Sequence, residues 1–228
     1  MVRMSLETRF KGALARFGYQ LRQIPAGVWR RDEGFKKALA RAAGRLLLDP
    51  TSCFMLHQHA LKAASLRGDC AEVGVYKGGS ALILASALAG TGKTVHLFDT
   101  FGGLPHPEAV DRHHAGDFGD ATLASVRELL KDQRVEFHPG LFPGTAEGVR
   151  AKEFCLVHVD ADLYRSTLDA CEFFYPRLTP GGFLVIDDYG VPTCPGVMKA
   201  VDEFFTGRPE RPLYLPSGQC VVEAVPRR

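Results

Sequence analysis

Two short acidic clusters could do chemistry, because each directly follows an apolar run. The first is His158-Val159-Asp160-Ala161-Asp162, and the second is Asp187-Asp188 after the run 183–186. If the two runs are neighbouring parallel strands, their carboxyl ends meet at one sheet edge, and Asp160, Asp187 and Asp188 can converge there. Unpaired carboxylates at an apolar edge repel one another, so a hard cation is their natural complement. All-oxygen ligation favours Mg²⁺ or Mn²⁺, with Ca²⁺ as a further option, over Zn²⁺.

A different interpretation of these acids needs no metal ion. In it they cap helices or pair with Arg165 and Lys199, which follow the two clusters along the chain. Alternation of polar and apolar residues would place His158, Asp160 and Asp162 on one face if the strand continues through them. No Ser-His-Asp arrangement and no zinc-ligand spacing is apparent in the sequence.

A glycine-rich segment, Glu72-Val73-Gly74-Val75-Tyr76-Lys77-Gly78-Gly79-Ser80, follows an earlier apolar run and opens a helix. Its glycines permit a sharp turn and close approach of a ligand to the backbone, and free N–H groups at the helix start favour a negative group. Its G-x-x-x-G-G spacing differs from the G-x-G-x-x-G of nicotinamide enzymes. The acid two residues before Gly74 suits a ligand with a positive group, such as the amino group of S-adenosylmethionine. A plain strand-to-helix turn is the alternative.

Asp99 ends the next predicted strand, twenty-five residues after Gly74. An acid at that position can accept two hydrogen bonds from a ribose diol, in dinucleotide and adenosylmethionine sites alike. It therefore favours a ligand with a nucleoside, without choosing between a dinucleotide and S-adenosylmethionine. A helix-capping role is the alternative.

The remaining histidines carry weaker signals. His106, His113 and His114 lie in a loop with glycine and aspartate, which predicts either a substrate-facing lid or a solvated loop. His57 and His59 lie on a helical stretch, where surface or packing roles are expected.

Short apolar runs alternate with helical stretches from residue 70 onward, which predicts an α/β fold with a mainly parallel sheet covered on both faces. The predicted strands are Cys70 to Val75, Val95 to Asp99, Val135 to His138, Phe154 to Val159 and Phe183 to Ile186. The predicted helices are Ser80 to Leu88, Ala121 to Leu130, Ser166 to Leu178 and Gly196 to Phe205. Leu213 to Leu215 and Cys220 to Val222, joined by Pro-Ser-Gly, predict a terminal hairpin at the sheet edge.

The composition is that of a globular chain. The 228 residues fit one large domain or a domain with an appendage, and 46% hydrophobic residues can form a substantial core. No apolar run approaches the length of a membrane span, and the start lacks the apolar stretch of a secretory signal, so a cytoplasmic location is expected. Six scattered cysteines without a C-x-x-C pair predict buried free thiols.

The first fifty residues are basic, with eleven Lys or Arg and four Asp or Glu. Apolar residues at helical spacing predict two amphipathic helices separated by Pro25 and Gly27: one through Leu6, Phe10, Leu14, Phe17 and Leu21, the other through Phe35, Leu39, Ala42 and Leu46. We therefore divide the chain into a basic helical extension or lid, 1–50, and a catalytic domain, 51–228. A membrane-surface or partner-binding helix is an alternative role for the extension. No nucleic-acid motif appears.

Four sequence blocks in this order resemble the macrocin O-methyltransferase (TylF/MycF-type) family of class I S-adenosylmethionine-dependent methyltransferases. They are Ala71 to Ser80, Leu97-Phe98-Asp99-Thr100-Phe101-Gly102-Gly103-Leu104-Pro105, His158 to Thr167, and Gly181-Gly182 with Ile186 to Gly190. The resemblance covers roughly residues 50 to 206.

The resemblance implies a Rossmann-like class I fold with a mainly parallel seven-stranded sheet, S-adenosylmethionine as methyl donor, and Mg²⁺. Its metal ligands would be Asp160, Asp187 and Asp188. The donor would contact Asp99 at its ribose, Glu72, Gly74 and Ser80 at its methionine end, and Val75, Tyr76, Gly78 and Thr100 nearby. The acceptor would be a small-molecule hydroxyl, expected on a sugar of a glycosylated metabolite; a homo-oligomer is left open.

For the reaction, we expect the cation to chelate two vicinal hydroxyls and Asp160 to take the proton, with His158 as the reserve base. A metal-dependent methyltransferase of catechols would use the same donor and cation. A nicotinamide dehydrogenase would share the fold but lacks its fingerprint here. A non-catalytic membrane- or partner-binding module with a degenerate methyltransferase domain is the alternative outside enzymology.

Overall fold

The computed structural model describes residue 16 and residues 28–226, and divides the chain into two compact units, 1–33 and 34–228. The first unit contains the short 3₁₀ helix η1 (Trp29–Arg31). The predicted helix through Leu6 and Leu21 lies outside the described residues. The second predicted N-terminal helix is present as α2 (Glu33–Arg41), which buries Phe35 and Ala38. The structural boundary after residue 33 thus lies earlier than the predicted division at residue 50.

A seven-stranded sheet forms the centre of the second unit, in the order β3-β2-β1-β4-β5-β7-β6. Strands β1 to β5 are parallel to their neighbours, and β7 runs antiparallel to β5 and β6. Both the mainly parallel sheet and the terminal hairpin are therefore confirmed. The strands are β1 (Asp69–Val73), β2 (Val95–Asp99), β3 (Val135–Pro139), β4 (Phe154–Val159), β5 (Leu178–Ile186), β6 (Leu213–Tyr214) and β7 (Cys220–Glu223).

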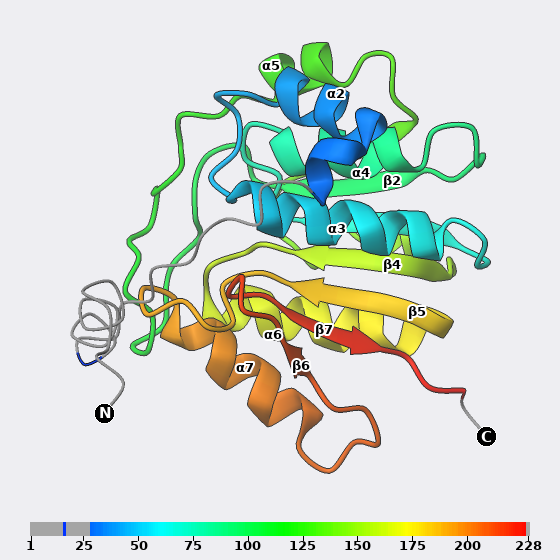
Figure 1. Ribbon diagram of the computed structural model, residues 1–228. Coiled ribbons are helices and arrows are strands. Elements are labelled where there is room, and N and C mark those ends of the chain that lie inside the picture. Colours follow the sequence, from blue (N-terminus) through cyan, green and yellow to red (C-terminus); the bar gives the residue numbers. More distant parts are fainter. Residues whose placement is uncertain (1–15, 17–27, 227–228) are drawn as a thin grey trace, which may run out of the picture. The chain divides into compact units, whose positions relative to one another are not determined.

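Helices cover both faces of this sheet (Figure 1). Residues of α3 and α4 pack into one apolar core, and residues of α6 and α7 pack into another on the opposite face. The helices are α3 (Pro50–Ala63), α4 (Gly79–Ala87), α5 (Leu123–Leu129), α6 (Tyr164–Phe174) and α7 (Pro195–Phe205), with the 3₁₀ helices η2 (Glu147–Val149) and η3 (Tyr175–Arg177). The predicted helix to Leu178 ends earlier, because Leu178 already begins β5.

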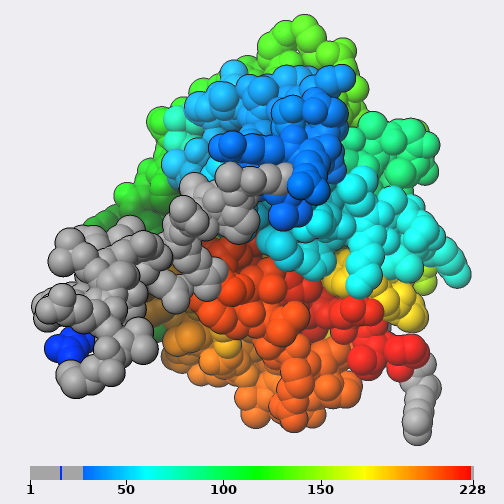
Figure 2. Space-filling view, in the orientation of Figure 1, coloured from blue at the N-terminus to red at the C-terminus, as the bar shows by residue number. Residues whose placement is uncertain are grey.

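Helix α3 begins where local chemistry favours a helix start. The Asp49 carboxylate accepts hydrogen bonds from the backbone N–H of Thr51 at 2.7 Å and of Ser52 at 3.4 Å, and Pro50 occupies the first turn. At its other end, Lys62 pairs with Glu223 of β7 at 3.8 Å. Figure 2 shows the cyan surface of α3 beside the red C-terminal segment.

All six cysteines are free and buried, as predicted. Within the part of the chain that the structure describes, no helix has both the length and the apolar composition needed to cross a bilayer.

The strand order reverses between β1 and β4. The segment after β1 leads to a helix on one face, and the segment after β4 leads to a helix on the other, so the two segments diverge at the carboxyl edge of the sheet. Ligands of open α/β sheets bind at such a point.

Candidate active site

A cavity of about 470 Å³ opens at the carboxyl edge of the sheet. Its size lies in the range of small-molecule sites. The segments after β1, β2, β4 and β5 all line it, together with residues 45–49 before α3 and the loop between β2 and α5.

The glycine-rich segment after β1 turns sharply at Gly74, whose φ is +86°. A Cβ at this position would lie 1.8 Å from the backbone oxygen of Asp160, so only glycine lets the segments after β1 and β4 come this close. Strand β1 ends at Val73, two residues before its predicted end, because this turn breaks the extended backbone.

Asp99, at the end of β2, fixes the shape of that segment. Its Oδ2 accepts hydrogen bonds from the backbone N–H of Val75 at 2.7 Å and of Tyr76 at 2.8 Å, and its Oδ1 accepts one from Phe101 at 2.6 Å. A carboxylate offers about four acceptor positions. One position on Oδ1 therefore stays available to a ligand in the cavity, where the sequence predicts two bonds to a ribose.

Four aspartates gather where the segments after β4 and β5 line the cavity: Asp160, Asp162, Asp187 and Asp188. Strand β4 ends at Val159, so the expected continuation of the strand through Asp160 and Asp162 does not occur. Asp162 and Asp188 instead adopt left-handed φ angles of +58° and +61°, which turn the chain back at both strand ends. The backbone N–H of Asp187 donates to Val159 at 2.8 Å, which holds the two turns side by side.

Burial raises the pKa of each of these carboxyl groups, and repulsion by neighbouring carboxylates adds to the increase at Asp160, Asp162 and Asp187. Burial is the largest cause for all four, and it raises the pKa of Asp162 to about 8 and of Asp187 to about 6. The pKa of Asp160 lies well above its usual range, with the charge of Asp187 as the next cause. A hydrogen bond between Asp162 and Asp188 raises the pKa of the former and lowers that of the latter.

No lysine or arginine among the described residues pairs with these aspartates. Arg165 binds Asp169 and Glu172 instead, and Lys199 binds Glu203, so the pairing considered in the alternative interpretation is not found. A divalent cation would offset this negative charge, and oxygen ligands of this kind fit Mg²⁺ or Mn²⁺.

His158 and Glu72 form a buried pair behind the aspartates. Nδ1 of His158 lies 2.8 Å from Oε1 of Glu72, and neither side chain is exposed. Burial lowers the pKa of His158, but the hydrogen bond and charge of Glu72 outweigh it, and the net direction is upward. Neither residue is among those that line the cavity, although the sequence assigned Glu72 to the donor and His158 to the reaction as reserve base.

The loop between β2 and α5 contributes His113 to the wall of the cavity. Its Nε2 lies 3.5 Å from Sγ of Cys194 and 3.9 Å from Oδ1 of Asp162, while Nδ1 faces Asp117 at 3.3 Å. The same loop is fixed to α6 because Oδ1 of Asp111 accepts from the backbone N–H of Tyr164 at 2.9 Å. His113 therefore lies at the cavity wall, whereas His114 is exposed.

Most of the predicted site residues meet at this cavity. Its lining includes Asp160, Asp187 and Asp188 of the predicted metal set, and Gly74, Val75, Tyr76, Ser80, Asp99 and Thr100 of the predicted donor set. Gly78 does not line it but caps α4 with a φ of +82°. Sequence reasoning missed Asp49 and Cys194, left the loop of His113 open between a substrate-facing lid and a solvated loop, and gave Asp162 no role. The alternating pattern around Asp160 was the one available signal for Asp162.

Comparison with solved structures identifies the fold. The chain superposes on the O-methyltransferase NovP with a TM-score of 0.66 at 23% identity, covering 76% of this chain and 79% of that one. It superposes on the calicheamicin methyltransferase CalS11 with a TM-score of 0.66 at 22% identity, covering 97% and 94%. The fold is therefore that of the class I methyltransferases, as predicted.

Curated relatives cover part of the chain at higher identity. A 36% match over 148 residues, 58% of this chain and 57% of the relative, is to 8-demethyl-8-(2,3-dimethoxy-alpha-L-rhamnosyl)-tetracenomycin-C 4'-O-methyltransferase of Streptomyces olivaceus. A 33% match over 168 residues, 64% and 65%, is to mycinamicin III 3''-O-methyltransferase of Micromonospora griseorubida. The chain thus aligns with less than two thirds of the length of these relatives.

The family model described as Macrocin-O-methyltransferase (TylF) matches residues 56–212, from within α3 to just before β6. This range contains the glycine-rich segment, Asp99 and all four aspartates of the cavity. The chain belongs to the macrocin-O-methyltransferase (TylF) family.

Proposed function

We propose that this protein is a Mg²⁺-dependent O-methyltransferase that moves a methyl group from S-adenosylmethionine to a sugar hydroxyl of a glycosylated natural product. The observation that carries the proposal is the group of four aspartates, without a lysine or arginine partner among the described residues, that lines the same cavity as the glycine-rich segment. The relatives support the acceptor class, because their names describe methyl transfer to glycosylated natural products. The six free buried thiols suit a reaction in the reducing cytoplasm.

The donor would lie along the segment after β1. Gly74 lets the donor approach the backbone, Asp99 offers its remaining acceptor position to the ribose, and Ser80 lines the same wall. Folds of this kind with bound S-adenosylhomocysteine, the demethylated donor, include an O-methyltransferase from Bacillus cereus with a TM-score of 0.60 at 15% identity. That likeness supports the donor through the fold alone.

Asp160, Asp187 and Asp188 would hold the cation. Mg²⁺ bound there would offset their repulsion and supply the positive charge that favours the ionised form of the acceptor hydroxyl. Glu72 and His158 act as positioning residues in this proposal, because the buried pair lies directly behind Asp160 and Asp187.

We assign to Asp162 the role of the base that accepts the proton of the acceptor hydroxyl. Asp160, expected from the sequence to take it, serves as a ligand, and His158 has no exposed atom in the cavity. Asp162 lines the cavity and is not among the three proposed cation ligands, so its carboxylate, when ionised, can accept the proton. The acceptor oxygen bonds to the methyl carbon, the methyl–sulfur bond breaks, and the hydroxyl proton passes to Asp162.

The test is transfer of labelled methyl from S-adenosylmethionine to a panel of rhamnosides, other glycosides and catechols, with Mg²⁺ and with EDTA. We expect product on a glycoside that EDTA abolishes and added Mg²⁺ restores. The exposed Asp132→Asn variant is the control and should behave as the unchanged protein. Product formation at full rate in EDTA would contradict the role of the metal, and transfer to catechols alone would contradict the acceptor class.

A further inference from the structure

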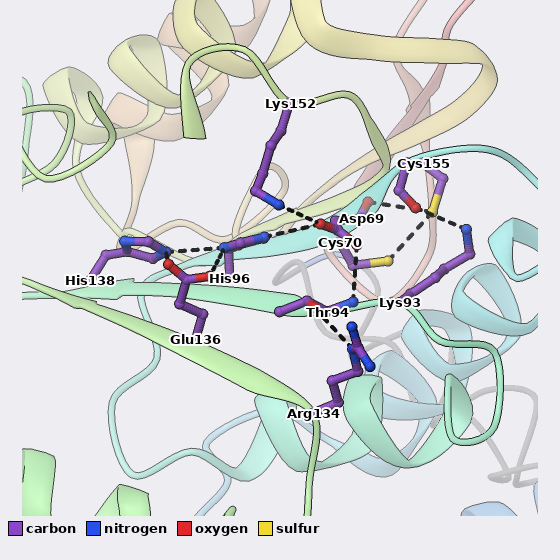
Figure 3. Close-up of polar contacts among 11 residues, drawn as sticks. Asp69, Cys70, Lys93, Thr94, His96, Arg134, Glu136, His138, Lys152 and Cys155 are labelled. Atoms are coloured by element: carbon purple, nitrogen blue, oxygen red, sulfur yellow. Dashed lines mark hydrogen bonds and ion pairs between the residues drawn. The ribbon is translucent and has the colours of Figure 1, made fainter. Parts of the chain in front are cut away.

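A second cluster of metal-ligating side chains lies on the sheet itself, away from the cavity (Figure 3). It consists of His96 from β2 and Glu136 and His138 from β3. His96 is directly opposite Glu136 in the parallel ladder, and His138 follows Glu136 by two residues, so all three point to the same face of the sheet. None of them lines the cavity described above.

We propose that these three residues form a binding site for a borderline transition-metal ion of the Zn²⁺ class. Nδ1 of His96 lies 3.1 Å from Nε2 of His138 and 3.5 Å from Oε2 of Glu136, and Nε2 of His138 lies 3.7 Å from Oε1 of Glu136. A tetrahedral ion with bonds of about 2.0 Å holds its ligand atoms roughly 3.3 Å apart. The three side chains are therefore spaced as ligands of one ion would be.

Asp69 of β1 gives His96 the orientation that metal binding requires. Its Oδ2 lies 3.3 Å from Nε2 of His96. An ionised carboxylate only accepts hydrogen bonds, so the proton of a neutral imidazole belongs on Nε2, and the lone pair of Nδ1 points at His138 and Glu136. Metal-binding histidines are typically oriented by a carboxylate in this way.

Asp69 is itself held in place from two sides. It accepts hydrogen bonds from the backbone N–H of Thr94 at 3.0 Å and from Nζ of Lys152 at 3.1 Å. The positive charge of Lys152 is thus matched by Asp69. Glu136, by contrast, has no lysine or arginine partner in the described part of the chain, and it supplies the negative charge of the ligand set.

The cluster is both rigid and open to solvent. The ring of His138 stacks on Phe98, with ring centres 4.4 Å apart and planes 11° apart. The side chain of His96 is fully buried and that of His138 is 10% exposed, whereas that of Glu136 is 54% exposed and leaves a path for an ion.

Two imidazoles and one carboxylate select Zn²⁺, Co²⁺ or Ni²⁺ over the Mg²⁺ that an all-oxygen site prefers. An ion there would join the edge strand β3 to β2.

Co²⁺ is the probe for this site because its visible absorption reports tetrahedral coordination, whereas Zn²⁺ does not absorb visible light. We would titrate the full chain with Co²⁺ in a large excess of Mg²⁺, which occupies the aspartates of the cavity. We expect one Co²⁺ per chain with tetrahedral absorption, displaced by Zn²⁺. Glu136→Gln and His138→Gln should each weaken binding at least about tenfold.

Matched control variants distinguish Co²⁺ binding at this site from Co²⁺ binding by other side chains. Glu128→Gln and His114→Gln change an exposed glutamate and an exposed histidine elsewhere and should bind Co²⁺ as the unchanged chain does. Asp188→Asn should also keep the tetrahedral signal, because that residue belongs to the cavity. Since Glu136 is exposed, its substitution should leave the metal-free melting temperature unchanged.

Zn²⁺ gives a second readout. It should raise the melting temperature of the unchanged chain and of the control variants, and should not raise that of Glu136→Gln. Unaltered Co²⁺ binding in Glu136→Gln and His138→Gln would overturn the proposal. So would an octahedral spectrum, a signal that disappears in Asp188→Asn, or no binding at all.

Discussion

At the scale of single residues, the four aspartates of the cavity divide into different roles by environment. Asp187 directly follows β5 and is buried near His158, whereas Asp162 lies near His113 and Cys194 at the cavity wall. One residue type thus offers both cation ligands and a group that exchanges a proton. This division follows from the turns at the two strand ends, where Asp162 and Asp188 take left-handed backbone angles.

Substitution of the two aspartates after β4 should separate these roles. We expect Asp162→Asn to lower turnover by about 10²- to 10⁴-fold with Mg²⁺ affinity retained, because a general base contributes that much. Asp160→Asn should lower both turnover and Mg²⁺ affinity. Single-turnover rates and calorimetric titration with Mg²⁺ measure the two effects. Normal turnover in Asp162→Asn would show that the proton leaves by another route.

At the scale of elements, the contact between the segments after β1 and β4 sets the shape of the cavity. Gly74→Ala should destabilise the protein by about 1–3 kcal/mol or more, because the new methyl group would meet the backbone of Asp160. Gly90→Ala is the matched control, with a similar φ of +80° and no atom within 4 Å of the new Cβ. Urea denaturation compares the two, and equal losses of stability would mean that the backbone angle alone accounts for the cost.

Most of these elements could be predicted from the sequence, because apolar runs and glycines favour strands and turns through interactions that are local in the chain. Strands β2 and β4 have the predicted bounds, and β5 begins earlier, at Leu178, where Leu178 and Thr179 are already buried. The site was harder to predict. Alternation along β4 grouped His158 with Asp160, and the glycine-rich motif assigned Glu72 to the donor, but both side chains are fully buried and pair with each other.

Residues from distant loops were hard to place at the cavity for a different reason. His113 reaches the cavity only because Asp111 holds its loop against the start of α6, and Asp49 lines the cavity while it caps α3. These contacts join parts of the chain far apart in sequence, and no spacing rule reports them. The pair of His96 and His138 is a further example, since ladder register brings them together.

At the scale of the whole molecule, the buried acids couple stability to pH. The pKa values of Asp162 and Asp187 are raised above those of an unfolded chain, to about 8 and about 6, so the folded state binds more protons than the unfolded state between about pH 4 and pH 8. In metal-free protein, stability from these groups is present at low pH and is lost as the pH rises through that window.

We therefore expect the melting temperature of the EDTA-treated protein to fall from pH 5 to pH 8, and Mg²⁺ to reverse most of that fall at pH 8. Differential scanning calorimetry at several pH values measures both effects. The Asp162→Asn variant should show a shallower dependence on pH. A melting temperature that rises over this range in EDTA would mean that these acids do not govern the pH dependence of stability.

The hydrogen bonds of Asp99 also bear on how the donor pocket could be redesigned. Asp99 holds Val75 and Tyr76 through their main-chain N–H groups alone, so these hydrogen bonds do not depend on which side chains the two positions carry. Tyr76 is half-buried and lines the cavity, whereas Val75 is packed in the core, so a library at position 76 can enlarge or narrow the wall for donors with bulkier transferable groups while Asp99 keeps the same main-chain contacts.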